Sequence, residues 1–178
     1  MAAVFPAVGN RYLVDFVKFR VELFFGSASS LTYTGVAPNG SRGQPSTVAI
    51  NVESIVDQIF LVTWQKADKT SVVHIENYDN NTIVTNITNP DNTFEQYHGT
   101  MKRLISYSSD IRPLFRASDI ACMATKGVKL DNFAWLSDPG HAQKVYAKLQ
   151  SGAMPPDGAW SQDKLSLFKD WIDDGHLS

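Results

Sequence analysis

The chain has 178 residues, with 16 Lys and Arg against 18 Asp and Glu, so its size allows one domain or two small ones. A formal net charge of -2 argues against nucleic-acid binding, which depends on clustered basic residues. The single cysteine, Cys122, excludes an internal disulfide and also the attachment of haem through a Cys-x-x-Cys-His motif.

The first part of the chain, residues 1–104, has the pattern of β-strands. Apolar or β-branched runs alternate with turns rich in Gly, Ser, Asn and Asp. Eight strands are predicted, over residues 12–16, 18–25, 29–36, 47–52, 58–66, 71–77, 82–88 and 93–104. Eight short strands with hairpin-like spacing indicate an antiparallel up-and-down barrel, which closes its sheet edges and has room for one small ligand.

From about residue 106 the apolar residues change to helical spacing. One helical stripe, capped by Asp138 and closed by Gly152, consists of Ala142, Val145, Tyr146 and Leu149. A second, capped by Ser161 and closed by Gly175, consists of Leu165, Phe168, Trp171 and Ile172. Shorter helices are predicted over residues 110–115 and 118–123. The expected fold class is α+β, with a barrel domain over residues 1–104 and a helical domain over residues 105–178.

Four segments of the first domain resemble the MoaF-like family over about residues 5–104. They are residues 60–65 (FLVTWQ), 72–78 (VVHIENY), 84–88 (VTNIT) and 97–101 (YHGTM). The resemblance implies a calycin-type, lipocalin-like β-barrel, distantly similar to phenolic acid decarboxylases. The catalytic Glu of those decarboxylases corresponds to Lys66 here, so decarboxylation of a phenolic acid is not expected.

The second domain, residues 106–176, resembles a class I cytochrome c-type domain. The resemblance is carried by residues 110–115 (DIRPLF), 130–131 (LD), 154–156 (MPP) and 167–175 (LFKDWIDDG). In that family a Cys-x-x-Cys-His segment follows the first helix. Here residues 119–123 read DIACM, so one thiol and the axial histidine are missing. The resemblance and this departure together imply a domain without haem, with Met154 packed as an apolar side chain, and no cofactor is expected.

His74 and Glu76 are the candidate catalytic residues, because strand alternation places both side chains on one face. A carboxylate beside an imidazole orients it and raises its basicity, which suits proton transfer near neutral pH. The same pair on the solvent face would be an ordinary surface pair, and the residue pattern weighs the two readings about equally. The family resemblance favours the inward face.

The remaining candidates would bind substrate: Trp64 and Tyr33 as pocket wall, Asn86 as a polar anchor, and Glu22 and Tyr97 as further contacts. Glu22 shares its face with Arg20, a pattern more typical of a solvated stripe. No metal site is expected, because the four histidines show no ligand spacing and there is no cysteine cluster.

These features predict a barrel that binds a small aromatic or hydrophobic metabolite. It would perform cofactor-independent acid-base chemistry of the isomerase, cyclase, hydratase or lyase type. A non-catalytic ligand carrier remains an alternative. So does a protein-interaction module anchored by Trp135, Trp160 and Trp171, although the simpler interpretation of these side chains is domain core. Without a leader-like start or an apolar spanning run, the chain is expected to be cytoplasmic and independent of membranes. A homodimer is the base-rate expectation.

Overall fold

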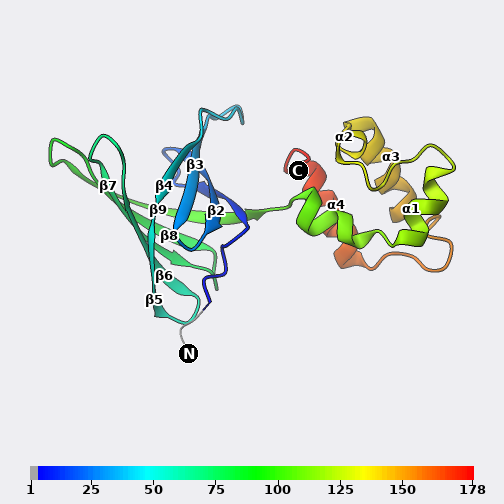
Figure 1. Cartoon of the computed structure of the whole chain (residues 1–178), viewed down its shortest axis with the longest axis horizontal. Coiled ribbons are helices and arrows are strands. Elements are labelled where there is room, and N and C mark those ends of the chain that lie inside the picture. Colours follow the sequence, from blue (N-terminus) through cyan, green and yellow to red (C-terminus); the bar gives the residue numbers. More distant parts are fainter. Residues whose placement is uncertain (1–3) are drawn as a thin grey trace. The chain divides into compact units, whose positions relative to one another are not determined.

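The computed structural model describes residues 4–178 and has two compact units, Met1–Arg103 and Leu104–Ser178 (Figure 1). The first unit is built from strands and the second from helices, so the fold is mixed α+β. None of the helices in the described residues is long and apolar enough to cross a membrane.

The first unit is a nearly closed antiparallel barrel, in the strand order β4-β3-β2-β1-β9-β8-β7-β6-β5. Its strands are β1 Arg11–Asp15, β2 Arg20–Ser27, β3 Ser30–Val36, β4 Ser46–Ala49, β5 Asn51–Val56, β6 Ile59–Gln65, β7 Ser71–Asn77, β8 Thr82–Thr88 and β9 Phe94–Leu104. Almost every strand pairs with the next one along the chain, as the hairpin-like spacing of the sequence predicts.

The barrel has nine strands instead of the eight expected, because the run 47–52 is interrupted at Ile50. Before that residue the chain pairs with β3 as strand β4, and after it with β6 as strand β5. The Ile50 side chain is buried, and its N–H donates to the carbonyl of Ser29 at 3.0 Å. One apolar run therefore bends at Ile50 and contributes residues to β4 and β5, the two edge strands of the sheet.

Short polar turns hold the hairpins in register. Lys69, Asn81 and Asn92 take the left-handed conformation, with φ of 73°, 56° and 66°. In the turn between β6 and β7, the Asp68 carboxylate accepts from the Thr70 N–H at 2.9 Å, which lowers the pKa of Asp68. Such side-chain hydrogen bonds mimic the backbone and fix the turn.

Strands β9 and β1, which are far apart in sequence, are neighbours in the sheet, and Gly99 permits a close approach. A Cβ added at Gly99 would lie 2.6 Å from the carbonyl oxygen of Asp15 and 2.8 Å from Cδ1 of Phe16. Any larger residue would have to displace the backbone, so this glycine is required by packing.

The second unit contains helices α1 Ala117–Ala124, α2 Phe133–Leu136, α3 Pro139–Gln150 and α4 Gln162–Asp173. The expected N-caps are present: Asp138 accepts from the His141 N–H at 3.0 Å, and Ser161 accepts from the Lys164 N–H at 3.5 Å. The helix expected over residues 110–115 is instead a π-helical turn, Tyr107–Ile111, followed by a 3-10 turn, Arg112–Leu114.

The helical unit has an aromatic core around Phe168 and Trp171, both fully buried. Trp171 also donates its indole N–H to the carbonyl of Leu177 at 2.8 Å. It is therefore a core residue, the simpler of the two interpretations, and is not exposed to anchor a partner. The likeness of this unit to cytochrome c-type domains stays a prediction.

Candidate functional site

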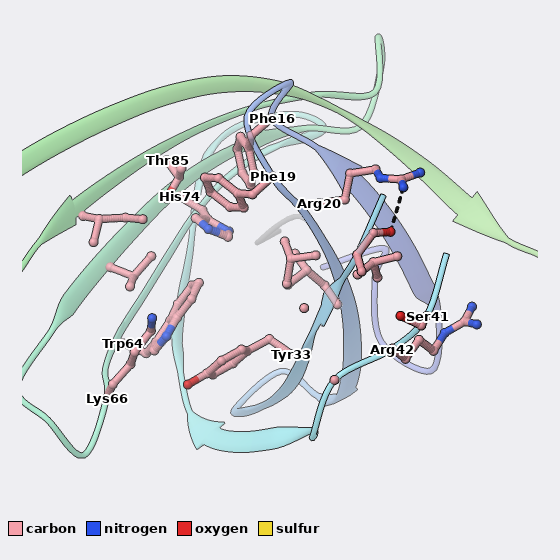
Figure 2. A pocket seen from close by; sticks show the side chains of 18 residues that line it. Phe16, Phe19, Arg20, Tyr33, Ser41, Arg42, Trp64, Lys66, His74 and Thr85 are labelled. Atoms are coloured by element: carbon pink, nitrogen blue, oxygen red, sulfur yellow. Dashed lines mark hydrogen bonds between the residues drawn. The ribbon is translucent and has the colours of Figure 1, made fainter. Parts of the chain in front are cut away.

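The barrel has a cavity of about 590 Å³ that is open to the outside (Figure 2). Its walls come from strands β2, β3, β6, β7 and β8 and from three connecting segments. These segments contribute Phe16 and Phe19 between β1 and β2, residues 37–43 between β3 and β4, and Lys66 after β6. The wall is mostly apolar and aromatic, and the volume lies in the range of small-molecule sites, roughly 300–1,000 Å³.

Three polar or amphipathic side chains meet on one wall of this cavity: Trp64, His74 and Thr85. They come from neighbouring strands, since His74 on β7 pairs with Thr85 on β8 and with Val62 on β6. The Trp64 ring stands edge-on to His74, with ring centroids 4.6 Å apart. Figure 2 shows all three on one side of the cavity, with Arg20, Ser41 and Arg42 on the other.

Two atoms of this wall are buried without a hydrogen-bond partner. They are the indole Nε1 of Trp64 and the hydroxyl Oγ1 of Thr85. Leaving such an atom unpaired costs about 1–3 kcal/mol, so buried polar atoms are normally satisfied. Both atoms are therefore available to donate a hydrogen bond if a neighbouring group comes within reach.

His74 belongs to a buried chain of hydrogen bonds that continues away from the cavity. The Tyr78 hydroxyl donates to Oε2 of Glu76 at 2.5 Å, and the other carboxylate oxygen, Oε1, lies 3.1 Å from Nδ1 of His74. When Glu76 is ionised it only accepts, and the Nδ1–H of His74 is then the donor to Oε1. The second ring nitrogen, Nε2, is then left with its lone pair for a ligand.

Glu76 is completely buried, and its charge affects the tyrosines around it. Burial raises the pKa of the Tyr78 hydroxyl far above its usual range, and the Glu76 carboxylate raises it further. Burial also raises the pKa of Tyr12, with the Arg103 guanidinium opposing this and Glu76 adding to it. Both tyrosines therefore remain neutral, and Tyr78 serves as a hydrogen-bond donor to Glu76.

The positive charges around the cavity are engaged by the protein itself. Arg20 Nη2 donates to the carbonyls of Ala37 and Pro38, each at 2.9 Å, and Arg42 Nε donates to Glu22 Oε2 at 2.6 Å. Both guanidinium groups turn away from the cavity centre in Figure 2. Lys66 lies with its ammonium 5.4 Å from the centre of the Tyr33 ring. The charged residues that line the cavity are thus all basic, and no carboxylate is among the lining residues.

The structure brings His74, Trp64 and Tyr33 together at the cavity and places Glu76 directly behind His74. Glu22, Asn86 and Tyr97 are not among the lining residues. Glu22 alternates with the lining residues Val21 and Leu23, and is buried beneath Arg11 and Arg42 at 2.8 and 2.6 Å.

The other two residues are occupied elsewhere. Asn86 alternates with the lining residues Thr85 and Ile87, and its Oδ1 accepts from Gln96 Nε2 at 2.7 Å. Tyr97 packs edge-on to Phe19 and donates its hydroxyl to Glu95. The assignment of a substrate contact to these two residues and to Glu22 therefore lacks support from their positions.

Comparison with known proteins bears on the barrel. The model of the MoaF-like family matches residues 8–102, more than half of the chain. The chain belongs to the MoaF-like family. A crystal structure from Burkholderia vietnamiensis, provisionally described as a beta-lactamase, is similar to this MoaF-like protein. The TM-score is 0.51 and the identity 20%, over 56% of this chain and 97% of the other. At that identity the likeness shows the fold alone, and no curated protein matches the chain.

Two residues of this candidate site in the MoaF-like barrel were not found from the sequence. Thr85 lies in the run 82–88, where β-branched residues occupy both faces of the strand. The sequence therefore does not show which face points inward. Tyr78 follows His74 and Glu76 in the same two-residue phase, and that spacing could have revealed it. Within residues 4–178, no group of three or more His, Cys, Asp or Glu side chains is arranged to hold a metal ion.

Proposed function

We propose that the barrel binds a small aromatic or hydrophobic metabolite and catalyses proton transfer on it without a cofactor. The observation that carries this proposal is the wall formed by Trp64, His74 and Thr85. Two of its buried polar atoms lack a partner, and its imidazole is backed by a buried carboxylate. The reaction would be of the isomerase, cyclase, hydratase or lyase type, each of which includes the transfer of a proton.

The geometry suits removal of a proton from a carbon next to a carbonyl group. Nε2 of His74 takes the proton, and the electron pair of the broken C–H bond moves to the carbonyl oxygen, giving an enolate. The indole N–H of Trp64 or the Thr85 hydroxyl, each without a partner in the wall, would donate to that oxygen and so stabilise its negative charge. Glu76 accepts from Nδ1 throughout, so it stabilises the imidazolium that forms and acts as a positioning residue.

Binding can be tested with a variant that fills the cavity. Gly35 lines the cavity, and a Cβ added there would meet no atom within 4 Å. Gly35→Leu should therefore occupy ligand space and keep the fold. The probe is para-hydroxyacetophenone, and the readout is the nuclear magnetic resonance shift of the His74 imidazole in the full chain labelled at histidine.

We expect the probe to shift the His74 signal in the wild type and to lose this effect in Gly35→Leu. The matched control is Gly26→Leu, because Gly26 is an exposed strand glycine outside the cavity whose added Cβ would make only an ordinary 3.8 Å contact. If the probe does not shift His74 in the wild type, or shifts it equally in Gly35→Leu, the site is not a ligand site of this kind.

Catalysis is tested separately, by following deuterium incorporation into the acetyl group of the same probe in deuterium oxide. His74→Gln should lower the protein-dependent exchange rate by about 10²–10⁴, the usual contribution of a general base. Glu76→Gln should lower it less and change its pH profile, as expected for a positioning residue. Binding at His74 with no exchange would instead support a non-catalytic carrier.

A further inference from the structure

The helical unit has a cavity of its own, of about 740 Å³. It lies between helix α1, helix α3 and the segment 154–160, all within residues 104–178. Nothing in the proposed barrel chemistry uses it. Its floor is apolar and is made chiefly by Phe115, Met123, Leu130, Val145, Leu149 and Met154.

The floor combines core residues with apolar side chains that the core does not fully cover. Phe115, Leu130 and Leu149 are buried, whereas Met123, Val145 and Met154 keep intermediate exposure. Methionine is flexible and polarizable, so it adapts to bound groups of different shape. A hollow of this volume with such a lining is of the usual size for binding a small molecule.

Basic residues outnumber acidic residues around this cavity. Lys126, Lys144 and Lys148 are exposed lining residues, and within residues 4–178 none of them forms an ion pair. The two lining carboxylates, Asp119 and Asp157, are already bound by Arg116 at 2.8 and 2.7 Å. Four cationic and two anionic side chains leave a net charge of +2 around an apolar floor.

Two of these lysines also repel each other. Lys144 and Lys148 are four residues apart on α3 and so share one helix face, an arrangement of like charges that destabilises an isolated helix. An anion held between them would relieve that repulsion. The apolar floor and the lysines thus favour opposite ends of the same ligand.

We propose that this cavity is a second ligand site, for a small amphipathic anion with an aromatic or aliphatic body and one acidic group. The body would lie on the floor around Met123 and Met154, and the acidic group would face Lys144 and Lys148. This site is independent of the barrel, and the two proposals can fail separately.

Cys122 provides a local readout, because it lines this cavity, is exposed and is the single cysteine of the chain. The experiment measures how far a bound probe slows alkylation of Cys122 by N-ethylmaleimide in the full-length protein. The probes are anilinonaphthalene sulfonate, which is anionic, and its uncharged relative phenylnaphthylamine. Binding in the barrel would not protect Cys122, so Gly35→Leu should leave the protection unchanged.

We expect both probes to protect Cys122, with the anionic probe binding more tightly. The double variant Lys144→Gln/Lys148→Gln should raise the dissociation constant of the sulfonate about three- to ten-fold and change that of phenylnaphthylamine less than two-fold. The control Lys129→Gln/Lys169→Gln makes the same charge change outside the cavity lining and should leave both constants unchanged. Fractional protection is compared, since lysines also alter the intrinsic reactivity of a thiol.

A cavity-filling variant, Val145→Phe, should abolish protection by both probes, with circular dichroism used to confirm that the helices remain. The proposal is overturned if neither probe protects Cys122. It is also overturned if the two lysine double variants weaken the sulfonate equally, because the charge would then act at long range and not at this site.

Discussion

The two cavities of this protein differ in where their polar groups lie. In the barrel the polar groups are buried in the wall, where Trp64 and Thr85 lack partners and His74 is held by Glu76. In the helical unit they are exposed charges at the edge of an apolar floor. Buried, fixed groups favour directed hydrogen bonds and proton transfer, whereas exposed lysines favour weak, salt-sensitive attraction. We therefore propose different functions for two cavities of similar volume, with proton transfer in the barrel and simple binding in the helical unit.

The largest effect is expected in the helical unit, on replacing its central aromatic residue. Trp171→Ala removes a fully buried ring and its hydrogen bond to Leu177, and should lower the free energy of unfolding by about 3–5 kcal/mol. Hydrogen exchange of α3 and α4 should rise, with the barrel strands as the internal reference. A loss below about 1 kcal/mol would show that this small core is not what holds the helices together.

The matching change in the barrel removes its buried carboxylate. Glu76→Leu leaves the Nδ1–H of His74 and the Tyr78 hydroxyl without an acceptor, and should destabilise the barrel by about 2–4 kcal/mol. Urea unfolding, combined with hydrogen exchange of β7, measures this. Glu76→Gln keeps an acceptor for Tyr78 and should cost less. Equal losses for Leu and Gln would show that the hydrogen bonds contribute little.

A smaller effect on stability is expected from replacing glycine by alanine in the barrel, and it should differ between Gly99 and Gly35. Gly99→Ala forces a Cβ against the Asp15 carbonyl and should cost about 1–3 kcal/mol. Gly35→Ala adds its methyl group to open cavity space and should be nearly neutral. Thermal unfolding of the two variants tests the difference. The assignment of open space at position 35 would be wrong if both lost the same stability.

The smallest effect concerns acid stability of the helical unit. Burial lowers the pKa of His176 below its unfolded value of about 6.5, so its neutral form is favoured in the folded state. The stability it contributes is present above pH 6.5 and is lost as the pH falls towards its folded pKa. His176→Asn suits the left-handed backbone at this position, where φ is 58°, and should flatten the pH dependence. An unchanged slope between pH 7 and 5 would assign the acid sensitivity to other groups.

Much of the fold could be predicted from local patterns. Strands 71–77 and 82–88 have the predicted bounds, and Asp138 and Ser161 cap the helices as expected. The corner at Ile50 was missed because the run 47–52 is uniformly suited to a strand, and only the closing of the barrel decides where it bends. Helix α2 has four residues, too few to show a helical period.

The sequence predicted which side chains share a face of a strand, but it did not predict which face points into the barrel. Two-residue spacing put His74 and Glu76 on the same face, but whether that face is inside depends on the neighbouring strands. In β8 both faces carry β-branched residues, so Asn86 and Thr85 were equally plausible lining residues from sequence. Glu22 is buried in the structure by Arg11 and Arg42, which are distant in sequence, and a local pattern carries no signal of that.

The bare backbone at Gly35 has a consequence for how this barrel could change its selectivity. Because the position faces free space and has an ordinary strand conformation, alanine, valine and leucine can be introduced there in a graded series. Each step would shorten the longest ligand that fits, while the proton-transfer groups on the opposite strands keep their positions. Under the proposed function, residue 35 alone would limit the length of the ligand, and the series of variants would measure that limit.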